Sequence, residues 1–314
     1  MSLRQLGRTD IHIAPLVLGT NTAGWTADEP TSFAIFDAFV DQGFTALDTA
    51  DVYSRWVPGN NSESERIIGR WLKTRGNRDK VHILTKVGSD IGQGKKDLSA
   101  AWIAQAVEGS LTRLQTDYID LYQSHWPDPS VTQDETLEAY DRLITAGKVR
   151  WIGASNYDAP LLSEALQISA DRKLPRYETL QNEYNLYTRD KYEGAVQDLV
   201  LANGLSLIPY YSLAAGFLTG KYRSKADLAQ SPRGGGIEKY LDARGLKILA
   251  ALDQVAANTG ATPAQVALAW VAAQPGVIGP LASATSVVQL EALARGAHLQ
   301  LSAEDLTHLT QAGA

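Results

Sequence analysis

Eight short apolar segments alternate along most of this chain with stretches that have the periodicity of amphipathic helices. Most of the eight are almost continuously apolar, as expected of β-strands buried on both faces. Alternation with helices favours a parallel α/β architecture. The predicted strands span residues 16–20, 45–48, 81–86, 119–125, 149–155, 178–184, 205–212 and 277–283. We therefore predict a (β/α)8 TIM barrel in which residues 1–314 form one domain.

An open dinucleotide-binding sheet fits this sequence less well than a barrel does. Such a sheet usually has the pattern G-x-G-x-x-G after its first strand. The sequence contains neither this pattern nor a P-loop. If a nucleotide binds here, we expect it to be held in another way.

Several predicted elements lie outside the regular alternation. Residues 3–6 and 11–14 flank Gly7-Arg8-Thr9-Asp10, which predicts a short N-terminal β-hairpin. Residues 246–255 and 301–309 predict additional helices. Residues 220–242 form a long polar stretch that is rich in basic side chains and glycine. Unstructured loops of this length are uncommon and often serve as lids or binding loops, with an insertion that has no role as the alternative.

Composition excludes several classes of protein. The net charge of -6 argues against nucleic acid as the main partner. The sequence has no cysteine, which excludes disulfides, thiolate nucleophiles and cysteine-ligated zinc. No apolar run approaches the roughly 20 residues that cross a bilayer, and the charged N-terminus is unlike a signal peptide. We expect a cytoplasmic protein without a membrane partner, while the oligomeric state stays open.

Four polar side chains follow predicted strands at the end of the barrel where active sites lie. Asp48, Lys86 and His125 end the second, third and fourth strands, and Tyr53 follows shortly after Asp48. Each alone has an ordinary explanation, such as a turn cap, a solvated strand end or surface packing. Because the carboxyl ends of the strands meet at one end of the barrel, we expect the four to converge.

This set of side chains suits the reduction of a carbonyl group without a metal. A carbonyl that accepts a hydride becomes an alkoxide and needs a proton. Tyr53 can supply that proton if its pKa, ordinarily about 10, is lowered by a neighbouring ammonium. Lys86 provides the ammonium, Asp48 holds it in place, and His125 can donate a hydrogen bond to the carbonyl oxygen.

Longer motifs around these residues resemble the aldo-keto reductases over essentially the full chain. The branch that the sequence resembles is bacterial and is also similar to the potassium-channel β subunits. The matching segments are residues 43–50 with Tyr53, 84–86, 118–126, 147–156, 181–185 and 211–222. Their order and spacing match throughout, so the resemblance is specific.

The resemblance implies roles for individual residues. Tyr53 is the implied general acid, Lys86 and Asp48 tune it, and His125 orients the substrate. NADP is the implied cofactor, with NAD still open. The implied cofactor-binding residues are Ser155, Asn156 and Gln181 at the carboxamide of the nicotinamide, Tyr211 stacked on its ring, Ser212, Leu213, Gly216, Leu218, Gly220 and Lys221 around the pyrophosphate, and also Gly19, Thr20, Asn21, Asp48, Arg223, Arg233, Ser283, Thr285 and Gln289.

The sequence departs from the family pattern at the adenosine end of the cofactor. The usual Glu-Asn pair is missing after Gln289-Leu290, and Thr285 stands where a basic side chain often contacts the 2′-phosphate. Arg223, Lys225 or Arg233 could supply that contact, with solvated loop charge as the alternative. The segment Ser286 to Gln289 also fits a capping box.

The substrate pocket is expected to have aromatic walls. Trp25, Trp56 and Trp126 follow the first, second and fourth predicted strands and would lie beside Tyr53 and His125. The alternative is that a tryptophan only covers the barrel rim. We expect a small carbonyl compound with some hydrophobic body as substrate.

Two competing functions remain open from the sequence. A binding protein that senses the nicotinamide cofactor would keep the cofactor site without needing all four catalytic side chains. A glycosidase is disfavoured, because it leaves Lys86, His125 and residues 211–221 unexplained and nothing fixes two carboxylates at a working separation.

Overall fold

A computed structural model describes residues 2–230 and 234–314 of the chain. Eight parallel strands form one sheet, in the order β10-β3-β4-β5-β6-β7-β8-β9. The strands are β3 (Val17–Gly19), β4 (Ala46–Asp48), β5 (His82–Val87), β6 (Ile119–Ser124), β7 (Val149–Ser155), β8 (Tyr177–Gln181), β9 (Ser206–Leu207) and β10 (Leu281–Ala282). Each lies within or overlaps one of the eight predicted segments, so the predicted strands are confirmed.

The two edges of the sheet meet and close it into a barrel. Leu207 of β9 forms a parallel bridge with Val277, and the Ile278 amide donates to the Leu207 carbonyl at 3.0 Å. Strands β9 and β10 are shorter than predicted. Pro209 and Pro280 lack an N–H to donate to a neighbouring strand, so regular pairing is interrupted beside both. The predicted (β/α)8 TIM barrel is confirmed.

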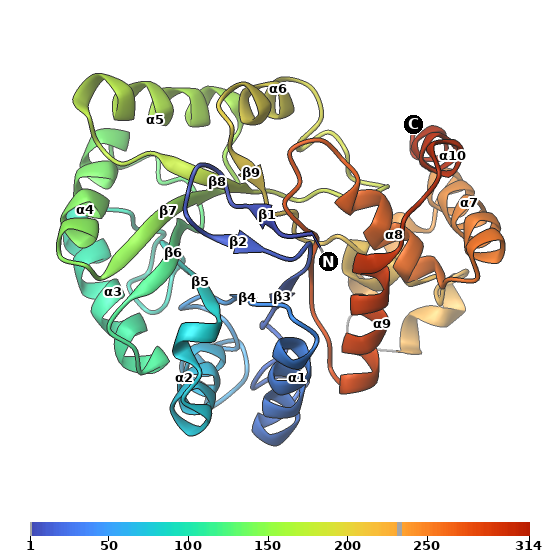
Figure 1. The fold of residues 1–314 in the computed structure, drawn as a ribbon, viewed down its shortest axis with the longest axis horizontal. Helices are drawn as coiled ribbons and strands as arrows, with labels where there is room; N and C mark the ends of the chain where they lie inside the picture. Colours follow the sequence, from blue (N-terminus) through green and yellow to red (C-terminus); the bar gives the residue numbers. More distant parts are fainter. Residues whose placement is uncertain (1, 231–233) are drawn as a thin grey trace.

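Helices follow the strands around the outside of the barrel (Figure 1). Those of the regular alternation are α1 (Glu29–Asp41), α2 (Glu63–Arg75), α3 (Ala100–Leu114), α4 (Gln133–Thr145), α5 (Ala159–Arg172), α6 (Ala195–Ala202), α8 (Pro263–Ala272) and α9 (Val287–His298). Two further helices are α7 (Ala243–Thr259), which contains the predicted helix at 246–255, and α10 (Ala303–Ala312), which overlaps the one predicted at 301–309.

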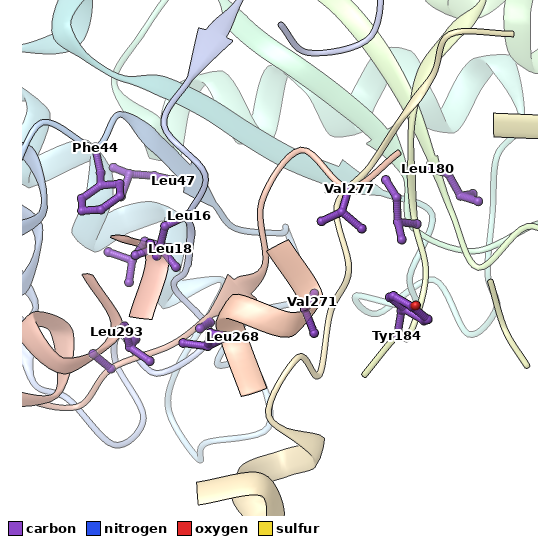
Figure 2. Packing of buried hydrophobic residues seen from close by; sticks show 14 of the residues in the cluster. Leu16, Leu18, Phe44, Leu47, Leu180, Tyr184, Leu268, Val271, Val277 and Leu293 are labelled. Carbon is purple, nitrogen blue, oxygen red and sulfur yellow. The ribbon is translucent and has the colours of Figure 1, made fainter. Parts of the chain in front are cut away.

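Two leucines, one in β3 and one directly before it, show how the outer layer of the core is built. Leu16 and Leu18 are 1% exposed and belong to the same cluster as Leu268 of α8 and Leu293 of α9 (Figure 2). Full burial of a leucine contributes about 1.5–3 kcal/mol through the hydrophobic effect. This layer fixes the helices against the strands and so holds the strand ends in place.

The N-terminal hairpin closes the opposite end of the barrel from the candidate site. Strands β1 (Arg4–Gln5) and β2 (His12–Ile13) pair antiparallel, as predicted. The apolar side chains of the hairpin join those that fill the barrel interior. This cluster comprises Leu6, Ile11, Ile13, Val17, Ala46, Leu84, Leu121, Ile208 and Ile278. The carboxyl ends of the strands therefore form the end at which polar side chains gather.

The long polar stretch at residues 220–242 contains short turns of helix where it is described. These are η3 (Lys225–Gln230), η4 (Gly234–Gly236) and η5 (Glu238–Tyr240), with η1 (Arg78–Lys80) and η2 (Ala214–Thr219) elsewhere. Ile237 and Tyr240 are buried in the main core cluster, so this segment packs on the barrel at its end. Arg233 lies outside the described residues.

Candidate active site

A buried lysine lies at the centre of the candidate site. Lys86 Nζ, near the end of β5, donates to Asp48 Oδ1 at 2.5 Å and to the Thr49 carbonyl at 2.8 Å. Its third contact is the Tyr53 hydroxyl at 3.0 Å. Lys86 and Asp48 are both 0% exposed. Neighbouring parallel strands β4 and β5 thus bring together the three residues that the sequence places at their ends.

The carboxylate of Asp48 is held on its second oxygen as well. Gln181 Nε2 of β8 donates to Asp48 Oδ2 at 2.9 Å, and Gln123 Nε2 of β6 lies 3.3 Å from the same oxygen. Sequence reasoning missed Gln123. Its signal was alternation: Gln123 lies two residues before His125 and so faces the same side of the strand.

The balance of burial and charge sets the ionisation of Lys86 and Tyr53. Burial disfavours the ammonium of Lys86, but Asp48 and Tyr53 outweigh it and raise the pKa of Lys86. Burial also raises the pKa of Tyr53 above 10, although Lys86 lowers it. The expectation of a lowered phenol pKa is therefore wrong for the protein without ligands, because desolvation exceeds the effect of the ammonium.

His125 completes the predicted group of four. Burial, assisted by the charges of Lys86 and Lys96, lowers its pKa well below 6.5, so the imidazole is neutral near pH 7. The ring centroid of His125 lies 6.0 Å from that of Tyr53, with the two planes at 75°. The four residues predicted to be catalytic therefore converge at one end of the barrel.

An aromatic wall surrounds the Tyr53 ring. Trp56 lies edge-on to Tyr53, with ring centroids 6.3 Å apart, and Trp25 lies edge-on to Trp56 at 5.5 Å. Trp126 stacks on His125, with centroids 5.7 Å apart and planes at 13°. Trp56 remains 49% exposed, so the wall is open to an incoming ligand.

A second group of polar residues lies at the ends of β7 and β8. Asn156, with a left-handed φ of 63°, donates to the His125 carbonyl at 2.9 Å and accepts from the Tyr210 hydroxyl at 2.8 Å. Ser155 Oγ donates to the Gln181 carbonyl at 2.7 Å. Gln181 Oε1 has no hydrogen-bond partner among the described residues, so it can accept a bond from a ligand.

An exposed tyrosine precedes a run of left-handed backbone. Tyr211 is 53% exposed and has a φ of 52°, and Ala214, Ala215 and Gly216 also have positive φ. Within the described chain, the N–H groups of Ser212 and Leu213 have no protein acceptor. Successive free N–H groups in such a backbone form a concavity suited to an anion. Leu218 is fully buried and Gly220 ends the turn at a φ of 80°.

The ends of β3 and β10 come close enough to form the other side of the site. A Cβ on Gly19 would lie 2.7 Å from Ser283 Oγ and from the Leu281 side chain, so a larger residue there would force these side chains to move. Ser283 Oγ donates to Asn21 Oδ1 at 2.7 Å. Thr20 is buried, and its hydroxyl donates to the Asp48 carbonyl at 2.9 Å.

Helix α9 begins just after this contact. Ser286 Oγ accepts from the Gln289 amide at 3.3 Å, which is half of the expected capping box. The Gln289 side chain accepts instead from the amide and hydroxyl of Thr285, at 2.9 and 3.0 Å. Thr285 and Gln289 thus already bind each other.

Two basic candidates for a phosphate contact form ion pairs within the protein. Arg223 makes a two-pronged pair with Asp253, at 2.7 and 2.8 Å, and Lys225 pairs with Glu238 at 2.7 Å. Lys221 Nζ lies 5.0 Å from the centroid of the neighbouring Tyr222 ring. A phosphate at Arg223 would compete with the Asp253 carboxylate.

The described residues contain neither a metal-binding cluster nor a membrane-spanning helix. Across residues 2–230 and 234–314, no three or more histidine or acidic side chains gather as a metal-binding group. Over the same residues, no helix combines the length and apolar character needed to cross a membrane.

Comparisons with known proteins agree with the resemblance seen in the sequence. A family model described as the aldo/keto reductase family matches residues 15–314. Protein tas of Escherichia coli (strain K12) is 32% identical over 335 residues, which cover 98% of this chain and 96% of that protein. Aldo-keto reductase YhdN of Bacillus subtilis (strain 168) is 35% identical over 315 residues, covering 97% and 91%. A probable voltage-gated potassium channel subunit beta of Oryza sativa subsp. japonica is 31% identical over 301 residues, covering 92% and 89%.

Proposed function

Because this chain belongs to the aldo/keto reductase family, we propose that it is an NADP(H)-dependent oxidoreductase that reduces aldehydes and ketones to alcohols. Tyr53 is the proposed general acid. The observation that carries the proposal is the 3.0 Å contact between the Tyr53 hydroxyl and the buried Lys86 ammonium, itself held by Asp48. A phenol beside a fixed cation is suited to losing a proton during a reaction and regaining it afterwards.

In the proposed reaction, the reduced nicotinamide supplies the hydride. Tyr53 then gives its proton to the carbonyl oxygen. A phenol is a far stronger acid than an alcohol even when burial raises its pKa, so this transfer is favourable once the oxygen becomes an alkoxide. Before the reaction, the raised pKa keeps Tyr53 fully protonated near neutral pH. Afterwards, the Lys86 ammonium stabilises the phenolate until a proton returns.

The residues that would hold the cofactor provide complementary groups. The open face of Tyr211 can stack on the nicotinamide ring, which leaves the other ring face for the substrate. Gln181 Oε1 can accept from the carboxamide, and the free N–H groups of Ser212 and Leu213 can bind the pyrophosphate. Asn156 and Ser155 would need to share or exchange their present hydrogen bonds.

Preference for NADP(H) over NAD(H) depends on the partner of the 2′-phosphate. Arg223 is the proposed partner within the described chain, because its guanidinium already binds a carboxylate in the paired geometry that also suits phosphate. Comparison of NADPH and NADH as reductants tests this part of the proposal separately from the chemistry.

The aromatic wall supports carbonyl substrates with a hydrophobic body. Trp56 lies 6.3 Å from the Tyr53 ring and Trp126 lies 5.7 Å from the His125 ring, while Trp25 packs on Trp56 at 5.5 Å. Aromatic faces give a large apolar contact area while the two polar groups fix the carbonyl oxygen. We therefore propose aromatic and longer aliphatic aldehydes, ketones and dicarbonyls as the substrate class.

The test compares wild type with Tyr53→Phe. Oxidation of NADPH and NADH is followed by absorbance against a panel of aromatic and aliphatic aldehydes and dicarbonyls. We expect Tyr53→Phe to lower kcat by about a hundredfold or more while cofactor affinity stays nearly intact. Wild-type turnover in this variant would refute Tyr53 as the acid.

A cofactor-sensing protein that turns over slowly is the second candidate. It is favoured by the similarity to a probable potassium channel subunit beta, which matches 92% of this chain. Tight binding of cofactor by wild type, without turnover of any member of the panel, would support this function over the reductase.

A further inference from the structure

The His125 side chain is held in a fixed orientation by several contacts. Its backbone amide donates to the Val87 carbonyl at 2.8 Å, and its carbonyl accepts from Asn156. The Trp126 ring stacks on the imidazole, and the Tyr53 ring meets it edge-on. These contacts fix the ring plane, so the remaining variable is which ring nitrogen carries the proton.

A buried serine contacts one of these two nitrogens. Ser89 Oγ lies 3.0 Å from His125 Nδ1, and Ser89 is 6% exposed. In the described part of the chain, Nε2 has no hydrogen-bond partner, and it is not among the fully buried polar atoms that lack one. Nε2 is therefore the nitrogen that a ligand can reach.

Counting protons decides the direction of the Ser89 bond. The neutral imidazole has one N–H, and the serine hydroxyl has one O–H. Among the residues that are described, Ser89 Oγ has no contact besides His125, so its proton has no other protein acceptor. If Nδ1 carried the proton, it would donate to Ser89 Oγ, and the serine O–H would then have no acceptor in the described protein. A buried unused donor is costly, which favours donation from Ser89 to Nδ1.

We propose that Ser89 is a positioning residue that sets the tautomer of His125, by donating to Nδ1 so that Nε2 carries the proton and can donate to the substrate oxygen. The histidine tautomer is generally set by the hydrogen bond at the opposite ring nitrogen. The consequence for catalysis rests on the proposed reductase function, whereas the tautomer itself does not.

The local backbone explains how Ser89 reaches His125. Gly88, directly after β5, has a φ of 105°, and a Cβ there would lie 2.7 Å from the Leu98 side chain. Glycine therefore lets the chain turn at the strand end, which places Ser89 three residues after Lys86. Gln93 Nε2 donates to the Ser89 carbonyl at 2.8 Å and holds the turn. The end of β5 and the turn after it thus supply Lys86, which contacts Tyr53, and Ser89, which contacts His125.

Nitrogen NMR of isotope-labelled histidines in the ligand-free protein tests the tautomer directly. The chain has five histidines, and His125→Asn identifies the signals of His125 by their loss. We expect wild type to show a protonated Nε2 and an unprotonated Nδ1. We expect Ser89→Ala to show a mixture of tautomers, and Ser89→Thr, which keeps the hydroxyl, to restore the wild-type pattern. A protonated Nδ1 in wild type, or an unchanged pattern in Ser89→Ala, would overturn the proposal.

Kinetics provide the second readout. We expect Ser89→Ala to lower kcat about tenfold, the change that corresponds to the loss of one hydrogen bond, with cofactor affinity unchanged. Ser99→Ala is the matched control, because it removes another hydroxyl from the segment after β5, one that caps α3 and does not contact His125. Equal loss of kcat in both variants would overturn the positioning role. Absence of turnover in wild type would count against the proposed reductase instead, and would leave the NMR result to judge Ser89.

Discussion

Asp120 is a buried carboxylate in the segment 118–126 that matches the aldo-keto reductases, but it lies at the start of β6, away from the strand end that forms the candidate site. It is the second residue of β6 and 1% exposed. Arg78 Nη2 and Arg150 Nη1 each lie 2.7 Å from its oxygens, and the Ile83 amide donates to it at 2.9 Å. These contacts link β5, β6 and β7, so replacing Asp120 with Asn should destabilise the barrel without touching the site.

The structure gives a magnitude for this effect. Burial by itself would raise the pKa of Asp120, but the His82 side chain, Arg78, the Ile83 amide and Arg150 outweigh it and lower the pKa from 3.8 to about 2. At about 1.4 kcal/mol per pKa unit, that corresponds to about 2.5 kcal/mol of stability at neutral pH. Because the folded pKa is the lower one, this stability is present above about pH 5. It is lost as the pH falls through 3.8 towards about 2 and below.

Urea unfolding of wild type and Asp120→Asn measures the difference in free energy of unfolding. We expect a loss of about 2.5 kcal/mol at pH 7, shrinking to about half near pH 3, where both unfolded chains carry a largely neutral side chain. Asp117→Asn is the control, since Asp117 is exposed on the same segment and forms no ion pair among the described residues. A loss below about 1 kcal/mol at pH 7, or one that does not shrink in acid, would refute the reasoning.

Three further predictions concern the site. Lys86→Met should lower kcat at least as much as Tyr53→Phe, about a hundredfold, because it removes the charge that stabilises the phenolate. A near-normal kcat in Lys86→Met would contradict the role of Lys86 in stabilising the Tyr53 phenolate. Since the pKa of His125 is lowered well below 6.5 and that of Tyr53 is raised above 10, kcat/KM for an uncharged carbonyl substrate should be flat between these values, and a pH titration showing a break inside the range would contradict it. Trp56→Ala should raise KM for aromatic aldehydes by roughly tenfold, because about 1.4 kcal/mol of aromatic contact is lost, and should leave KM for short aliphatic aldehydes little changed. Steady-state kinetics on matched aldehydes measures this, and an equal rise in KM for both kinds of aldehyde would contradict the prediction.

The barrel could be predicted from the sequence because burial on both faces leaves a strong local signal. Apolar segments separated by amphipathic helices identify all eight strands. The strand ends beside Pro209 and Pro280 were less clear, because the apolar composition continues after regular pairing stops. Those limits depend on which backbone groups face a neighbouring strand, and only the assembled sheet fixes that.

Parts of the candidate site could likewise be predicted from the sequence, and other parts depend on the assembled structure. Convergence of Asp48, Tyr53, Lys86 and His125 follows from the parallel sheet, since the carboxyl ends of its strands meet. Alternation along β6 places Gln123 on the same side of its strand as His125, but its contact with Asp48 depends on the register between strands. The contact of Ser89 with His125 depends on one turn, for which the sequence has no local sign. The direction of the Tyr53 pKa was missed for a different reason, since it depends on how far burial exceeds the attraction of one ammonium.

Charge balance at the site supports the assignment of separate tasks to its four residues. Asp48 and Lys86 form an ion pair, while Tyr53 and His125 are neutral near pH 7, so the group has no net charge before a reaction. A negative charge that develops on a carbonyl oxygen would then meet two neutral donors rather than a free cation. Neutral donors favour a carbonyl over an anionic ligand at rest, and the nearby ammonium stabilises the phenolate once the proton has moved. In this proposed sequence of events His125 must donate to the carbonyl oxygen through Nε2. The contact of Ser89 with Nδ1 therefore matters for the proposed reaction, because it favours the tautomer that can donate.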